Sequence, residues 1–250
     1  MILHWLGLAI LLALFSPASA IIGGSDAYPG EFPQVVSITN FDDHICGGSI
    51  LSATEILTAA HCVDDINPNS LGVLVSSINR YTDWGRIRVQ EYRIPEEYDR
   101  KTYANDIAVI YLSRPIELSV VAEPVRFPSD PNLRENVEAV VVGWGLTTAQ
   151  GLDQAAILQK LDATTTSRDL CEHRWDLTVY PNSSVFCTSY PWGKGTCYGD
   201  AGGPIFNSAR EQIGILGLAA DCDLDNPGLN FNVSHYLDWI QRNQVKDQEK

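Results

Sequence analysis

A histidine, an aspartate and a glycine-rich segment are the residues of this sequence best suited to acyl-transfer chemistry. His61 stands beside Cys62 after the apolar stretch 57–60, and Asp106 opens another apolar stretch, 107–112. An imidazole oriented by a carboxylate takes the proton of an attacking hydroxyl, and backbone amides stabilise the oxyanion that then forms. Each residue alone is weak evidence, because a lone histidine is usually an ordinary core or surface residue and an aspartate often forms a turn before a strand.

Short apolar, β-branched segments separated by turn residues must position these side chains. Segments of this size, bounded by Gly, Pro, Asn and Asp, predict an all-β barrel or sandwich. A helix is predicted only near the end, where Val233, Tyr236, Leu237 and Ile240 recur at the helical period and Ser234 is the expected cap. The predicted strands are Gln34–Ile38, Gly72–Ile78, Ile107–Leu112, Val137–Val142 and Gln212–Leu218.

The charge balance excludes one class of partner. The 250 residues include 31 acidic and 17 basic side chains, for a net charge of −14, which repels a nucleic-acid backbone. With 45% hydrophobic and 19% charged residues, the composition is that of a folded protein. No C-x-x-C pair or His-rich cluster indicates zinc, so we expect neither a metal nor a cofactor.

The N-terminal segment has the pattern of a secretory signal peptide. An apolar run from Trp5 to Phe15 is followed by Ala18-Ser19-Ala20, the small-residue pattern after which signal peptidase cuts. The alternative is a membrane anchor, but the run is shorter than the roughly 20 apolar residues that span a bilayer. We therefore predict a signal peptide over residues 1–20 and a secreted, soluble product comprising residues 21–250, with no membrane association.

In a secreted chain, cysteines can form disulfides and Asn-x-Ser sequons can be glycosylated. An even number of cysteines in a secreted chain predicts disulfides, although these residues alone leave every pairing open. Asn182 and Asn232 are the candidate glycosylation sites. The six cysteines are Cys46, Cys62, Cys171, Cys187, Cys197 and Cys222.

Further motifs stand in a characteristic order around His61 and Asp106. Together they resemble the trypsin/chymotrypsin family of serine proteases over essentially all of residues 21–250. This resemblance implies two six-stranded antiparallel β-barrels of the chymotrypsin type, an active site in the cleft between them, and disulfides joining Cys46 to Cys62, Cys171 to Cys187 and Cys197 to Cys222. The motifs are Ile21-Ile22-Gly23-Gly24, Cys46-Gly47-Gly48-Ser49, Gly143-Trp144-Gly145 and Gly199-Asp200-Ala201-Gly202-Gly203-Pro204.

The nucleophile of that family is missing here. His61 and Asp106 match the general base and its orienting acid, but the serine position is Ala201. Because a methyl group cannot attack a carbonyl, we predict that the chain is not an enzyme; in a related triad system, loss of the serine costs about a million-fold in turnover. The oxyanion donors, the backbone amides of Gly199 and Ala201, need not be lost. The alternative is an active neutral-pocket endopeptidase in which Ala201 is an introduced replacement for serine.

The resemblance also implies an altered substrate pocket. Gly195 takes the base position where trypsins carry aspartate, so no anion would anchor Arg or Lys. The edge that usually reads Ser-Trp-Gly is Gly217-Leu218-Ala219, and the Ala219 methyl is expected to narrow the entrance. Gly228 belongs to the back wall, and Tyr198, at the rim, either folds across the pocket or lies on the surface. An acidic run, 221–225, either steers a basic partner or is a solvated loop.

Activation is expected to differ as well. Ala20, rather than Arg or Lys, precedes Ile21. The resemblance therefore implies that removal of the signal peptide itself frees the Ile21 amine, which would pair with Asp200 and order the loops around the cleft.

These observations predict a secreted, inactive serine protease homologue that acts by binding a protein. The expected role is that of a decoy or inhibitor in a proteolytic immune cascade such as host complement, performed as a monomer. The lost serine, altered groove and rim tyrosine resemble the inactivated protease paralogues of the scabies mite. A structural or storage role without a specific partner is the remaining alternative.

Overall fold

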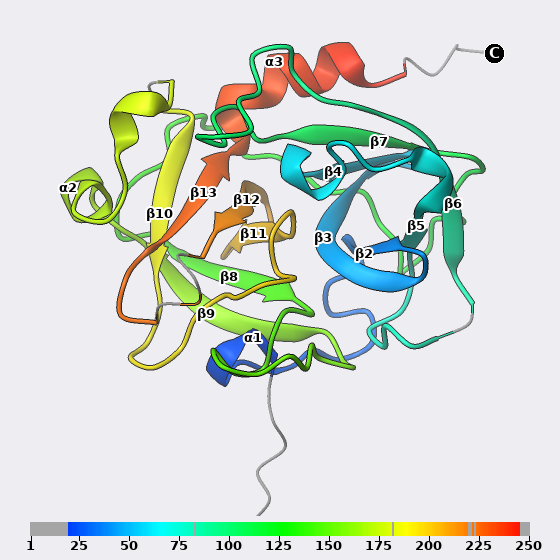
Figure 1. The fold of residues 1–250 in the computed structure, drawn as a ribbon, viewed down its shortest axis with the longest axis horizontal. Helices are drawn as coiled ribbons and strands as arrows, with labels where there is room; N and C mark the ends of the chain where they lie inside the picture. The colour runs from blue at the N-terminus through cyan, green and yellow to red at the C-terminus, as the bar shows by residue number, and fades with distance from the viewer. Residues whose placement is uncertain (1–19, 83, 182, 220–221, 223, 246–250) are drawn as a thin grey trace, which may run out of the picture.

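The computed structural model describes residues 20–245 except residues 83, 182, 220–221 and 223 (Figure 1). Of the predicted signal peptide, only the backbone of Ala20 is described. The sequon residue Asn182 lies outside the described residues, as do Asp221 and Asp223 of the acidic run. Within the described part, none of the helices combines the length and apolar character needed to cross a membrane.

The first barrel contains six antiparallel strands and closes on itself in the order β2-β3-β4-β7-β6-β5. Its short strands are rich in Val, Ile and Leu, which suits a pleated surface with one face in a core. β7 is buried along its whole length. The strands are β2 (Val35–Asn40), β3 (Asp43–Ser52), β4 (Glu55–Thr58), β5 (Leu71–Leu74), β6 (Arg86–Arg93) and β7 (Ala108–Leu112).

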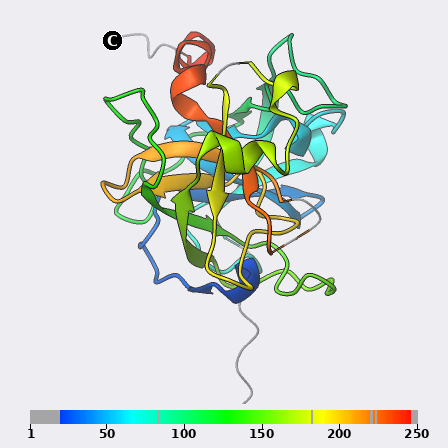
Figure 2. The same ribbon diagram turned by 90° about the vertical axis from the view of Figure 1, so that its left-hand side faces the viewer.

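The second barrel follows the order β9-β10-β13-β12-β11-β8 and closes where β8 pairs with β9. The two-residue strand β1 (Ser25–Asp26) adds to the outside of β9. Figure 2 shows this barrel facing the viewer, with the C-terminal helix α3 (red) at its upper edge. The strands are β8 (Glu138–Gly143), β9 (Gln159–Thr165), β10 (Val185–Ser189), β11 (Pro204–Asn207), β12 (Gln212–Leu218) and β13 (Gly228–Asn232).

The fold class expected from the sequence is thus confirmed, as are the positions of the predicted strands. One strand is shorter than predicted: the segment expected to extend to Ile78 ends at Leu74 as β5. The chain turns at Ser76, whose φ of 60° is in the left-handed region and interrupts an extended strand.

Helical segments are few and mostly short. Those of the described residues are α1 (Ala20–Gly23), η1 (Ala60–Cys62), η2 (Pro68–Ser70), α2 (Arg168–Glu172), η3 (Leu177–Val179) and α3 (Val233–Asn243), the η elements being 3-10 turns. α3 confirms the predicted C-terminal helix, with Val233, Tyr236 and Ile240 buried. It also crosses back to the first barrel, since the Tyr111 hydroxyl donates to the Asn243 carbonyl.

The cap of α3 differs from the prediction. Asn232, not Ser234, is the N-cap, and its Oδ1 accepts a hydrogen bond of 3.1 Å from the Ser234 amide. Its Nδ2 donates to the Ser183 carbonyl at 2.9 Å, and the residue is only 6% exposed. Because a glycan attached to this Nδ2 needs access to solvent, the burial of Asn232 leads us to predict that its sequon is unmodified in the folded protein.

Three disulfides join the pairs that the resemblance implied, and this expectation is confirmed. Cys46–Cys62 ties β3 to η1, Cys171–Cys187 ties α2 to β10, and Cys197–Cys222 links two loops beside the cleft. Two hydrogen bonds also join the halves of the molecule directly. Ser49 Oγ donates to Gln212 Oε1 at 2.8 Å, and the Tyr180 hydroxyl donates to the Thr102 carbonyl at 2.8 Å. These contacts hold the two halves of the molecule together.

Candidate active site

His61 and Asp106 meet at the junction between the barrels. His61 lies on the turn η1 after β4, and Asp106 lies just before β7, the strand that pairs with β4. Asp106 is fully buried and accepts two hydrogen bonds from His61: 2.6 Å from Nδ1 to Oδ2 and 2.8 Å from the backbone amide to Oδ1. Because a carboxylate only accepts, Nδ1 carries the proton and the Nε2 lone pair is left as the base.

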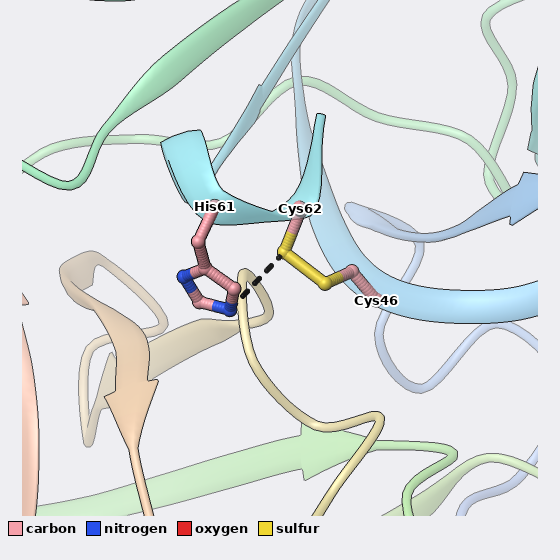
Figure 3. A group of neighbouring side chains, drawn as sticks. All are labelled: Cys46, His61 and Cys62. Atoms are coloured by element: carbon pink, nitrogen blue, oxygen red, sulfur yellow. Dashed lines mark hydrogen bonds between the residues drawn. A yellow bond between two sulfur atoms is a disulfide. The ribbon is translucent and has the colours of Figure 1, made fainter. Parts of the chain in front are cut away.

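The disulfide Cys46–Cys62 flanks the histidine ring (Figure 3). His61 Nε2 lies 3.7 Å from Cys62 Sγ, and the potential ligand atoms of the three residues all lie within 4.8 Å of one another. Zinc binds cysteine as thiolate. Since the two sulfurs are bonded to each other, this group offers no thiolate ligand to a metal.

The backbone amides of Gly199 and Ala201, the expected oxyanion donors, both belong to residues that line the cleft. The Tyr198 carbonyl accepts from the Leu146 amide at 2.9 Å, and the Asp200 carbonyl accepts from the Gly203 amide at 3.1 Å. In a trans peptide the C=O and N–H point in opposite directions, so both bonds turn the amides of Gly199 and Ala201 away from those acceptors. Within the described residues neither amide has an acceptor, although both residues line the cleft.

His44, which has no motif context in the sequence, positions this loop. Its Nε2 bonds the Gly199 carbonyl at 2.9 Å and its Nδ1 bonds Ser37 Oγ at 2.7 Å. A carbonyl only accepts, so Nε2 carries the proton and Nδ1 accepts from the serine hydroxyl. Burial lowers the pKa of His44 to about 4, which keeps it neutral. No motif surrounds His44 in the sequence, so only the contact across the barrels shows its function.

Asp200 is buried behind the loop. Its Oδ1 accepts from the Gly145 amide at 2.8 Å and its Oδ2 from the Cys197 amide at 2.9 Å. Burial raises the pKa of this carboxyl to about 7. A side chain at Gly143 or Gly145 would collide with the carboxylate, which explains the Gly-Trp-Gly motif. Ile21 is also fully buried in the second barrel, but its pairing with Asp200 stays a prediction.

A cleft of about 790 Å³ contains the centre of this site. It brings together His61, the Cys46–Cys62 disulfide and the oxyanion segment, with the expected pocket residues Tyr198, Gly217, Leu218 and Ala219 along one wall. Tyr198 lines the cleft and is 60% exposed, and its folding across the pocket stays a prediction.

The other two expected pocket residues do not line the cleft. Gly195 and Gly228 are buried, and both lie against the ring of Tyr190: a Cβ on Gly195 would be 3.6 Å from Tyr190 Cδ2, and one on Gly228 would be 3.3 Å from the hydroxyl. The Tyr190 hydroxyl bonds Thr188 Oγ1 at 2.9 Å. The expected base and back wall of the pocket are thus packed against a tyrosine that the sequence did not single out.

Several lining residues escaped the sequence reasoning because they come from segments remote from the motifs. Tyr103 lies edge-on to His61, with ring centroids 5.6 Å apart. Trp175, from the segment after α2, donates its Nε1–H to the Pro227 carbonyl at 2.9 Å. Gln154 and Arg174 also line the cleft. Nothing in their local sequence indicates this location.

Paired antiparallel barrels with an Asp–His pair and two unengaged amides between them define the architecture of a chymotrypsin-type serine protease. The family model described as Trypsin matches residues 21–240, and the chain belongs to this family. It is 32% identical over 225 residues to Brachyurin of Leptuca pugilator, covering 88% of this chain and 97% of that protein. Chymotrypsin-2 of Vespa crabro is 31% identical over 226 residues, covering 90% of this chain and all of that protein (100%). Trypsin Tyr p 3.0101 of Tyrophagus putrescentiae is 31% identical over 228 residues, covering 88% of this chain and 79% of that protein.

Proposed function

We propose that this chain is a secreted, catalytically inactive member of the trypsin family that binds a protein segment in its cleft. The carrying observation is Ala201 at the expected nucleophile position, beside a His61–Asp106 pair that is in place. His61 is oriented by Asp106, and the amides of Gly199 and Ala201 are available to a carbonyl oxygen. Such a site holds a peptide carbonyl but supplies no hydroxyl to form an acyl-enzyme.

The partner we propose is a component of a proteolytic immune cascade such as complement, with this protein acting as a decoy or inhibitor and as a monomer. A protease-like cleft without the nucleophile binds a substrate segment but does not cleave it. The segment therefore stays bound instead of being released as product. The resemblance of the lost serine and altered groove to the inactivated scabies mite paralogues supports the same role. Secretion is supported by the three disulfides, which persist in oxidising compartments.

We further propose that the mature chain begins at Ile21 and that its amine pairs with Asp200. In the unprocessed chain Ile21 has φ 42°, a left-handed conformation that is strained for a β-branched residue. Cleavage before Ile21 removes the preceding peptide and with it this strain. It also supplies an ammonium group to a buried carboxyl that has only amide partners among the described residues.

The deciding experiment compares the mature protein with an Ala201→Ser variant and an Ala201→Ser/His61→Ala control in peptide-library hydrolysis. The proposal expects the native chain to be silent and to bind peptides that the Ser variant cleaves. Cleavage by the native chain at the rate of an ordinary protease would overturn it. If neither the native chain nor the Ala201→Ser variant binds or cleaves any peptide, the cleft is not the binding surface.

A second function rests on the same geometry: an active endopeptidase in which alanine was introduced in place of serine. The His61–Asp106 pair, kept in working order, is the observation that favours it. Sequencing codon 201 in the transcript of the source organism separates the two functions, because a serine codon there makes the natural protein an enzyme.

A further inference from the structure

The cleft contains one charged side chain whose function is unassigned. Among the described residues that line it, Arg174 alone carries a permanent charge. Most of the other walls are apolar or aromatic and include Ile45, Ile66, Tyr103 and Leu218. A single guanidinium in such surroundings is a strong determinant of which segments fit, because an unpaired charge on a ligand is penalised more in an apolar cleft than in water.

Arg174 is held by a rigid support. The amides of Arg174 and Trp175 both donate to the Cys171 carbonyl, at 3.1 and 2.9 Å, and Cys171 is tied to β10 by its disulfide. The Trp175 ring is fixed in turn by its hydrogen bond to the Pro227 carbonyl. The guanidinium lies 5.0 Å from the centre of this ring, a cation–π contact that limits its freedom.

Among the described residues the Arg174 guanidinium has no anionic partner. Within the described residues Arg174 forms no ion pair and its side chain donates no hydrogen bond, whereas Arg168 on the same segment pairs with Glu172 at 2.7 Å. A guanidinium has five N–H donors in a planar fork that matches a carboxylate. Arg174 is exposed on the wall of a cleft, stacked on a fixed ring, and has all five donors available to a ligand.

We infer that Arg174 recognises a carboxylate, and that the extended segment bound in the cleft carries an acidic side chain flanked by apolar ones. The inference rests on the proposed function, because it names the chemistry of the segment that the cleft holds. A guanidinium on the cleft wall disfavours the basic partner that the acidic run 221–225 suggests. Asp221 and Asp223 lie outside the described residues, and Asp225, although exposed, is not among the residues that line the cleft.

The test uses the native mature chain and a library of extended peptides in which one position at a time is fixed as Asp, Glu, Gln or Lys. Arg174→Gln is compared with Arg168→Gln, a matched loss of one positive charge outside the cleft. We expect acidic peptides to bind roughly tenfold or more tightly than their Gln counterparts. We expect Arg174→Gln to abolish this difference, Arg168→Gln to keep it, and Arg174→Glu to reverse it in favour of Lys.

Each outcome is decisive. Peptide binding without an acidic preference, or with one that survives in Arg174→Gln, overturns the role of Arg174 and leaves the proposed function standing. Absence of any peptide binding by a native chain with a cooperative thermal transition overturns both. If Arg174→Gln fails to fold, the charge-reversed Arg174→Glu and the Asp-against-Gln comparison on the native chain still decide the question.

Discussion

Asp106 holds His61 through two hydrogen bonds at once, from the ring Nδ1 at 2.6 Å and from the backbone amide at 2.8 Å. The double contact fixes both the tautomer and the position of the ring. The imidazole is therefore set as a base in a site whose nucleophile position is Ala201. The alanine at residue 201 thus stands beside a histidine–aspartate pair whose hydrogen bonds are intact.

The first prediction concerns the missing hydroxyl. Ala201→Ser should react with a fluorophosphonate probe, because His61 and the amides of Gly199 and Ala201 are already positioned for the serine alkoxide and its oxyanion. Mass spectrometry should find the label at residue 201 and none on the native chain. Ala201→Ser/His61→Ala is the control and should label far more slowly. An unreactive Ala201→Ser variant with native-like stability would show that the site is not preformed.

The second prediction follows from His44. Its pKa in the folded protein is about 4, below the ordinary value of 6.5, so the native state favours neutral histidine. Well above pH 6.5 His44 is neutral in both states and its contribution does not change with pH. As the pH falls from 6.5 to 4, the unfolded chain binds a proton that the folded chain does not, and the free energy of unfolding decreases by roughly 3 kcal/mol.

Urea denaturation at pH 7.5, 5.5 and 4 measures this decrease. His44→Gln keeps polar groups but does not titrate, so the stability difference between the native chain and this variant should shrink as the pH falls. If the free energies of unfolding of the two proteins differ by the same amount at every pH, the lowered pKa of His44 is contradicted. Since His44 also holds the Gly199 carbonyl, the variant should additionally bind peptides more weakly at pH 7.5.

The third prediction concerns the N-terminus. In a chain extended before Ile21, Asp200 is buried with a pKa of about 7, above its ordinary value, so the stability of that form should fall as the pH rises from about 4 to 7. In the chain that begins at Ile21, the ammonium should keep Asp200 ionised, and this loss should disappear. Thermal melts of the two forms between pH 4 and 8 measure the difference.

Asp200→Asn separates the two forms further. In the extended chain it should cost about 1–3 kcal/mol, because the Asn Nδ2 cannot accept the amide hydrogen bond that one Asp200 oxygen takes from Gly145 or Cys197. It should destabilise the chain that begins at Ile21 by about 3 kcal/mol or more beyond this, since it also leaves a buried ammonium without its partner. Equal effects in both forms would exclude the ion pair.

The fourth prediction concerns Asn232. Mass spectrometry of the secreted protein should find no glycan at this residue, because its side chain is buried and both of its polar atoms are bonded. Asn232→Ala should lower the free energy of unfolding by about 1–2 kcal/mol through loss of the α3 cap. Ser234→Ala removes the same sequon without removing the cap and should cost much less. A glycan at Asn232 in the folded protein would contradict the structure.

Much of this protein follows from its sequence alone. The β-branched segments predict an all-β barrel or sandwich, and the resemblance carried by the motifs implies the two barrels and the pairing of the six cysteines. The absence of a serine at residue 201 is likewise visible without a structure, because it depends on one residue type at one position.

Only the tertiary structure decides which side chains share the cleft. Gly195 and Gly228 belong to the family pattern, yet both lie against Tyr190 and neither lines the cleft. Arg174, from the loop after α2, does line it, and His44 reaches Gly199 from the other barrel. Sequence patterns report local periodicity and turn chemistry, whereas a cleft between two barrels is formed by loops far apart in the chain, whose positions are set by packing and by hydrogen bonds that no local pattern encodes.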